Sequence, residues 1–402
     1  MNIWSSLRGL PRDIWILAGA TLINRAGTMV LPFLVLYLTR ELGFSAPRAG
    51  LALAVYGAGS IIAAPVAGLL SDRIGPLPIM RASLVLTGLL MLLYPLIDSY
   101  AAVIALTLVW AIVTEAYRPA SLAMIADVVE PVQLKPAYAL IRLAINLGMS
   151  VGPAAAGFLA ADSFRLIFIV DGLTTIAAGI VLTVTRFDRG TRREPTSVSP
   201  ARLLNPLIFD DRRMLLFLSA LFLTGFVFFQ HEGALPLFLV NDLQLSTAFY
   251  GLLFTINTVM IVLMEVPLNA ATAHWPHHRA LALGAFLFAA GSGAFAFASG
   301  PVVIVVGIVV WTFGEMLLFP QASAYVAEIA PAHRRGEYMG AFSLSFSLAF
   351  AFSPWAGATG LAAFGARPLW LFVFAVGAVS ALMMLRVTAE RQQSEQATII
   401  SA

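Results

Sequence analysis

The residues of this chain best suited to chemistry are carboxylates placed inside apolar stretches. Glu115 lies between Trp110 and Pro119, and about 200 residues later Glu315 follows Trp311 in a similar setting. A charge in lipid costs roughly 2.5–3.5 kcal/mol or more, so a residue of this kind usually serves a function. The two glutamates therefore predict a proton-binding group inside a membrane in each half of the chain.

The similarity between the two stretches extends beyond the glutamates. Asp127 and Pro131 end the first pattern, and Glu328 and Pro331 end the second. A repeat at half the chain length of a hydrophobic protein is typical of transporters built from two related halves. We therefore expect two related halves, each with its own protonatable group.

The composition indicates an integral membrane protein. The 402 residues are 60% hydrophobic and only 11% charged, and the mean hydropathy is +0.89, far above that of ordinary soluble domains. Because the chain has no cysteine, it has no disulfide framework, thiolate metal site or cysteine nucleophile. We expect no metal site, no cofactor and no nucleic-acid partner, and the lack of a nucleophile–base cluster predicts that the protein is not an enzyme.

Twelve apolar windows are long enough to cross about 30 Å of hydrocarbon as helices, which predicts an all-α membrane protein. They lie approximately at 14–38, 49–70, 79–97, 100–125, 137–161, 166–185, 214–240, 247–268, 280–299, 302–327, 338–363 and 369–386. The polar segment 186–213 separates an N-terminal half, 1–185, from a C-terminal half, 214–402.

The basic residues predict the orientation of these spans. Most of the 24 Lys and Arg residues fall on the side of the N-terminus, whereas Arg40, Arg48, Arg165 and Arg367 fall on the other side. Since positive charge accumulates in cytoplasmic loops, both termini are expected in the cytoplasm. The compact chain indicates a bacterial inner (plasma) membrane.

The segment between spans two and three resembles a motif of the major facilitator superfamily. The family pattern G-x-L-a-D-r-x-G-r-k is matched, in what we expect to be a tight cytoplasmic turn, by Gly68, Asp72, Arg73 and Gly75. In that family the acid and the base form a cytoplasmic latch with an acid at the end of span four, a position that Asp127 occupies here. The basic pair that should follow is replaced by Pro76, Leu77 and Pro78, and D-R-x-G is also a general helix-capping turn.

A second resemblance lies in span five. Gly148, Gly152, Pro153 and Gly157 match the G-x3-G-P-x3-G motif of the superfamily's drug:proton exporters, which implies export rather than import. Small residues at this spacing also serve ordinary packing of membrane helices, and a proline bends the helix that contains it. The arginine that such exporters carry in the first half of span four is absent.

The resemblance covers nearly the whole chain and implies two pseudo-symmetric six-helix bundles around a central cavity. It implies a monomeric secondary transporter in the lipid bilayer, driven by the proton gradient, that exports small amphipathic compounds by alternating access. One alternative is a specific exporter or carrier of a sugar, a siderophore or a (lyso)lipid. A membrane sensor that transports nothing is another.

The charges inside the first half leave two interpretations open. Glu115 and Arg118 are three residues apart and can pair on one continuous helix. The pair is either static, or protonation of Glu115 frees Arg118 and couples a proton to a rearrangement. Arg25 has no acid at pairing distance on its own helix, so Glu115 or an anionic substrate is its expected partner. Arg142 belongs either to the latch or to the cavity.

In the second half, His231 and Glu232 lie side by side in span seven. A carboxylate beside an imidazole suits proton handling, so Glu232 joins Glu115, Glu315 and Arg118 as a candidate for proton coupling. The candidates for the cavity lining are Asn24, Arg25, Asn146, Gln230, His231, Asn257, Trp311 and Gln321. Asp171, in span six, is expected to cap its helix or to pair locally with Arg165.

Overall fold

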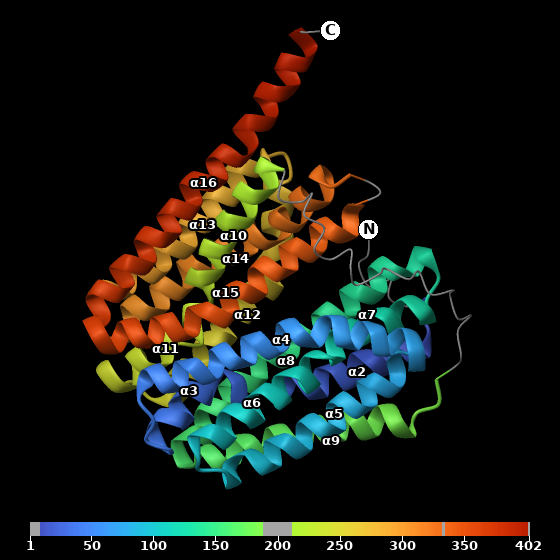
Figure 1. The fold of residues 1–402 in the computed structure, drawn as a ribbon, viewed down its shortest axis with the longest axis vertical. Helices are drawn as coiled ribbons and strands as arrows, with labels where there is room; N and C mark the ends of the chain where they lie inside the picture. The colour runs from blue at the N-terminus through green and yellow to red at the C-terminus, as the bar shows by residue number, and fades with distance from the viewer. Residues whose placement is uncertain (1–8, 188–210, 332–333, 401–402) are drawn as a thin grey trace. The chain divides into compact units, whose positions relative to one another are not determined.

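The computed structural model describes residues 9–187, 211–331 and 334–400, without the side chains of Asp72, Pro131 and residues 388–400. In this part of the chain, helices are joined by short turns and there is no strand. Twelve helical segments are long and apolar enough to cross a membrane (Figure 1). The expected all-α fold with twelve transmembrane helices is confirmed.

Spans one and four are each divided into two helices. The first six spans are α2 (Arg12–Ala26) with α3 (Val30–Arg40), α4 (Ala46–Ile74), α5 (Pro76–Leu93), α6 (Tyr100–Glu115) with α7 (Tyr117–Val128), α8 (Leu134–Asp162) and α9 (Phe164–Val184). Both interruptions fall beside charged residues, Arg25 in span one and Glu115 in span four.

Span seven is interrupted as well. It consists of α10 (Arg212–Phe228), a 3₁₀ turn (Phe229–His231), α11 (Ala234–Leu237) and a π-helical turn (Phe238–Asp242). The remaining spans are α12 (Thr247–Thr272), α13 (His277–Ala294), α14 (Pro301–Ile329), α15 (Arg335–Phe364) and α16 (Ala366–Ile400). The interruption in span seven contains His231.

The helices gather into two compact units. Unit 1 is built from described residues within 1–45, 55–197 and 246–258, and unit 2 from those within 46–54, 198–245 and 259–402. The first turns of α12 therefore count with unit 1. The division predicted from the sequence, with a separate segment 186–213, stays a prediction because most of that segment lies outside the described residues.

The core of unit 1 holds the helices that later position the site. α2 packs against α8 and α9, and α5 packs along α9. Ile14 and Leu17 of α2 are fully buried together with Met80 of α5 and Ile125 of α7. These apolar side chains pack around the first part of α2. The polar residues Asn24 and Arg25, at the end of α2, are not members of this apolar cluster.

The glycines of α8 allow α2 to approach closely. A Cβ atom at Gly152 would lie 2.9–3.1 Å from three backbone carbonyl oxygens of residues 25–28, and one at Gly148 would lie 2.5 Å from the Cβ of Arg25. A Cβ at Gly157 would lie 2.6 Å from the carbonyl oxygen of Thr247. These contacts give the motif of span five a packing role, and its link to export stays a prediction.

Substituting Gly152 with alanine is expected to lower the melting temperature of the detergent-purified protein. The added methyl group meets backbone oxygens, which cannot move aside as the end of a flexible side chain can. Gly68→Ala is the matched control, because nothing lies within 4 Å of the added Cβ and alanine is favoured over glycine in helices by up to about 1 kcal/mol. Equal melting temperatures for the two variants would contradict this packing.

The turn expected between spans two and three is shorter than predicted. α4 continues through Ile74, and only Gly75, with φ of +88°, adopts the left-handed conformation that leads into α5. The prediction of a turn starting at Gly68 is therefore wrong. Arg73 is exposed, Asp127 is half-buried in α7 and Arg142 is exposed in α8. The latch stays a prediction, since the side chain of Asp72 lies outside the described part.

Candidate functional site

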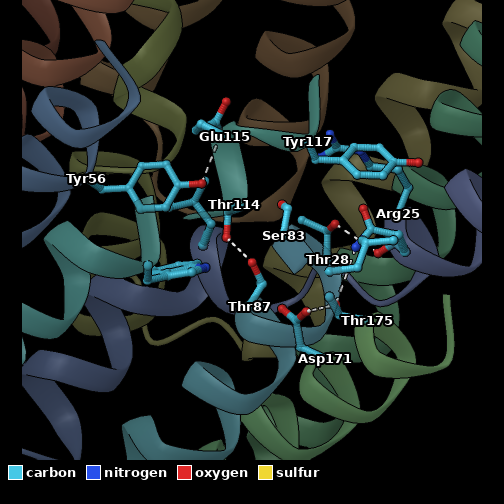
Figure 2. Close-up of a pocket in the computed structure, with 14 residues that line it drawn as sticks. Arg25, Thr28, Tyr56, Ser83, Thr87, Thr114, Glu115, Tyr117, Asp171 and Thr175 are labelled. Atoms are coloured by element: carbon cyan, nitrogen blue, oxygen red, sulfur yellow. Dashed lines mark hydrogen bonds between the residues drawn. The ribbon is translucent and has the colours of Figure 1, made fainter. Parts of the chain in front are cut away.

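A polar cavity of about 80 Å³ lies inside unit 1 (Figure 2). It is lined by Asn24, Arg25, Thr28, Leu31, Tyr56, Ser83, Leu84, Thr87, Trp110, Thr114, Glu115, Tyr117, Asp171 and Thr175. A molecule of liquid water takes up about 30 Å³, and pockets for drug-sized ligands measure roughly 300–1,000 Å³. The cavity therefore has room for water molecules or a small ion and is smaller than a typical pocket for a drug-sized ligand.

Glu115 lies at the C-terminal end of α6, on the cavity wall. Its Oε1 accepts a hydrogen bond of 3.0 Å from the hydroxyl of Tyr56 on α4. The ring of Tyr56 packs edge-on against Trp110, with 4.7 Å between the ring centroids, which holds the hydroxyl in place. The carboxyl group is thus half-buried, positioned by a neutral donor and adjacent to space for water, an arrangement that suits binding and release of a proton.

The predicted ion pair between Glu115 and Arg118 is wrong. The helix is interrupted at Ala116, because Pro119 offers no N–H to the carbonyl group of Glu115, four residues before it. The side chain of Arg118 is exposed and does not line the cavity. Among the described residues these two side chains form no ion pair in this structure, so the release of Arg118 by protonation of Glu115 has no support here.

Arg25 brings a positive charge to the same cavity. Its Nε atom is buried and has no hydrogen-bond partner. Figure 2 shows Arg25 on the side of Tyr117 and Glu115 on the side of Tyr56. A buried donor without an acceptor costs about 1–3 kcal/mol, so an oxygen atom that enters the cavity gains a ready partner here.

Asp171 has a role that the sequence did not reveal. Its Oδ2 accepts hydrogen bonds of 3.0 Å from the backbone N–H groups of both Met29 and Val30, where α3 begins. Its Oδ1 accepts from the hydroxyl of Thr175 at 3.3 Å. The carboxylate therefore caps a helix that starts in the middle of span one. The expectation of a local cap or a pair with Arg165 is wrong.

Span one contains a signal that could have indicated this break. Gly27 and Pro32 flank the start of α3, and a Cβ at Gly27 would collide with the hydroxyl of Thr174 on α9. Asn24 donates to Thr175 at 3.4 Å, so α9 contacts both sides of the interruption. Glycine and proline close together inside an apolar span are typical of a discontinuous helix.

In unit 2, the interruption of span seven brings His231 and Glu232 together. Nδ1 of His231 lies 2.7 Å from the carbonyl oxygen of Phe228, and its Nε2 lies 3.6 Å from Oε1 of Glu232. Neighbouring side chains diverge on a regular α-helix, so this contact depends on the local change of backbone geometry. The pair is half-buried and forms a second place where a proton can reside.

Three other residues that the sequence predicted to line a substrate cavity have partners within unit 2. Trp311 stacks on Phe228 with 5.0 Å between ring centroids. Gln230 is 1% exposed and donates from Nε2 to Oγ of Ser353 at 3.0 Å. Oε1 of Gln321 lies 2.9 Å from Nδ1 of His277. These contacts give all three residues structural roles, and their contact with a substrate stays a prediction.

The remaining candidates lie apart from the polar cavity of unit 1. Asn146, Asn257 and Glu315 are half-buried on α8, α12 and α14. Within the described ranges, no group of three or more His, Asp or Glu side chains could hold a metal ion. Glu115 is thus the one candidate for proton coupling that the structure places in that cavity.

The arrangement of the helices and their half-chain repeat agree with the comparison to known families. The family model described as Major Facilitator Superfamily matches residues 17–246 and 231–401, nearly the whole chain. The chain belongs to the major facilitator superfamily. It is therefore an integral, multi-pass membrane transporter for small molecules, and the resemblance seen in the sequence is confirmed.

Two relatives of this superfamily member are similar along most of their length, and a third along about half of it. A Bacillus subtilis protein named "Uncharacterized MFS-type transporter YqjV" is 26% identical, with 92% of this chain and 91% of the relative covered. A "Na(+), Li(+), K(+)/H(+) antiporter" of Planococcus maritimus is 24% identical, with 84% and 87% covered. "Quinolone resistance protein NorA" of Staphylococcus aureus is 24% identical over 49% of each chain.

Solved structures support the same fold for this transporter. The crystal structure of a peptide transporter of the POT family in complex with sulfate superposes with a TM-score of 0.78. That comparison covers 98% of both chains at 15% sequence identity. A likeness at this identity concerns the fold alone, so the substrate has to be argued from the site.

Proposed function

We propose that this superfamily member exports small amphipathic compounds in exchange for protons, with Glu115 as the proton-binding group of unit 1. The observation that carries the proposal is the position of Glu115 in a water-sized cavity, where a neutral tyrosine hydroxyl is its hydrogen-bond donor. A carboxyl group held in this way can gain and lose a proton without breaking an ion pair. Glu232 or Glu315 is the matching group of unit 2.

Export against a gradient requires that proton and substrate stabilise opposite states of the transporter. Arg25 and the carboxylate of Asp171 line the same cavity and offset each other's charge. A protonated Glu115 leaves this balance unchanged, and an ionised Glu115 adds one negative charge. The protonation state therefore changes the net charge inside the membrane, where charge is costly, and this difference is available to bias the conformational equilibrium.

Because the cavity is small, we assign it to the proton and water rather than to the transported compound. An amphipathic compound needs a larger site, for which the aromatic cluster around Phe228 and Trp311 supplies an apolar surface next to Glu232. The similarity to a cation/proton antiporter favours proton exchange. The half-length similarity to a quinolone resistance protein favours a drug-like compound as the substrate. The transporter then acts as a monomer in a bacterial inner membrane with both termini in the cytoplasm, powered by the proton gradient without a cofactor.

A second candidate function is the exchange of a monovalent metal cation for protons. It is favoured by the antiporter relative, which matches over 84% of this chain. Oxygen atoms suited to such a cation line the cavity on α5, α6 and α9. Arg25 in the same cavity opposes it, because two positive charges within a small cavity repel each other.

The two candidates are separated by proton release from inverted membrane vesicles. Vesicles from a bacterial host without its own efflux pumps are energised until their lumen is acidic, and a fluorescent weak base measures the pH difference. We expect lipophilic cationic compounds to dissipate the gradient and Na⁺, Li⁺ or K⁺ to leave it unchanged. Dissipation by metal cations alone would replace the first proposal with the second, and no response to either class would leave sugars, siderophores, lipids or a sensor role.

A further inference from the structure

Helices α10, α15 and α16 of unit 2 pack against one another, and an apolar groove of about 620 Å³ lies between them. Phe222 and Phe226 line it from α10, Phe352 and Trp355 from α15, and Phe372 and Val376 from α16. Each of these three helices belongs to a membrane span. The groove is therefore a feature of the transmembrane part of the protein.

Aromatic rings give the groove a floor and a rim. Phe226 is 6% exposed and packs against Phe352 and Phe372, with ring centroids 6.1 and 6.2 Å away. The outer parts are open, since Phe352 is 45% and Phe372 58% exposed. Because these exposed side chains are apolar and lie on membrane spans, contact with lipid is more favourable for them than contact with water, which favours a groove that opens toward the hydrocarbon of the bilayer.

The chemistry of the walls selects the occupant. No charged residue lines the groove. Its one hydroxyl, Oγ1 of Thr359, is buried without a hydrogen-bond partner, and the indole of Trp355 carries the other polar side-chain group of the lining. A charged group would find no opposite charge there. The volume is about four times the roughly 150 Å³ of a cavity that holds benzene, enough for a flexible chain of many carbons.

We propose that the groove binds one acyl chain of a membrane phospholipid. The gain comes from packing: the surrounding lipid is already apolar, so the chain is held by its many van der Waals contacts with the rings. An unfilled groove would forfeit those contacts on three helices at once. This inference does not rest on the proposed exchange of protons and compounds.

The bound chain would lie next to the interruption of span seven. Phe226 is two residues before the end of α10. On α15, Pro354 packs against the interruption, where a Cβ at Gly233 would lie 2.5 Å from the Cα of Pro354, while Trp355 lines the groove. An acyl chain therefore contacts the helices that hold Glu232 in place, and its presence stabilises them.

The test uses a phospholipid that carries a photoreactive diazirine at the end of one acyl chain. The purified full-length protein is reconstituted in liposomes with a few per cent of this lipid, irradiated and digested, and the labelled peptides are identified by mass spectrometry. We expect peptides from the groove on α10 and α15 to be labelled several-fold more than the exposed face of α13 at Leu283 and Phe286, which are 37% and 45% exposed.

Two variants of α16 make the test specific. Val376→Phe fills the groove, whereas Val379→Phe adds the same ring one turn further on, at an exposed position that does not line it. Labelling of α10 and α15 should fall several-fold in the first variant and remain unchanged in the second, with both proteins eluting as a single peak.

Equal labelling of α13 and the groove would overturn the proposal, because equal labelling is the result expected for lipid that surrounds the protein without binding to it. Labelling that Val376→Phe leaves unchanged would overturn it as well. Loss of labelling on addition of a transported lipophilic compound would show that the groove holds the compound instead of a lipid. The proposed proton exchange is measured separately in vesicles, so its failure leaves this result interpretable.

Discussion

Glu115→Gln is expected to reduce proton-driven transport to background while the protein stays folded. Glutamine has nearly the same shape as glutamate and keeps an oxygen that can accept the hydrogen bond from Tyr56, which measures 3.0 Å in the structure. It cannot bind or release a proton at neutral pH. The substitution therefore removes the charge and leaves the contact, so a purely structural role for Glu115 would tolerate it.

The measurement compares two kinds of transport in vesicles at equal expression. Uptake driven by an imposed pH gradient should disappear in Glu115→Gln, whereas exchange of labelled for unlabelled compound without a gradient should persist, since exchange requires no net proton movement. Glu265→Gln is the matched control, with the same chemical change at a half-buried position of α12 outside the cavity. Gradient-driven uptake at the wild-type rate in Glu115→Gln would assign the coupling to unit 2.

The fold could be predicted from the sequence because its main signal is local. A span shows itself as about twenty consecutive apolar residues, and the twelve expected windows correspond to the twelve membrane helices. The prediction failed where a membrane-spanning helix is interrupted. Glu115 and Arg118 have the spacing of a helical pair, but the spacing applies only to a continuous helix, and Pro119 ends that continuity at Ala116.

The site was predicted in part. The features that the sequence did not predict are hydrogen bonds between residues far apart in the chain. The cost of a charge in lipid singles out Glu115 and Arg25 from the sequence alone. Nothing in the sequence indicates that Tyr56 is the donor to Glu115, because the two residues are 59 positions apart. Asp171 was expected to form its contacts on its own helix. The backbone N–H groups from which it accepts hydrogen bonds are instead 141 and 142 positions away in the sequence. Such partners are decided by tertiary packing.

Asp171→Leu is expected to destabilise unit 1 more than any other single change to the cavity. The first N–H groups of a helix have no partner within it, and at the start of α3 two of them, on Met29 and Val30, donate to Asp171. In the membrane no bulk water replaces this acceptor. Two buried donors left without a partner cost about 1–3 kcal/mol each, so the melting temperature and the yield of folded protein should both fall.

Asp171→Asn separates the cap from the charge. Asparagine is about as good as aspartate at a helix N-terminus, so its melting temperature should stay close to that of the wild type. Asp162→Leu, at an exposed position near the end of α8, controls for the loss of an aspartate as such and should also be stable. A stable Asp171→Leu protein would contradict the capping role. A stable Asp171→Asn protein that has lost gradient-driven transport would instead show that the negative charge of Asp171, set against that of Arg25 in the same cavity, takes part in the coupling.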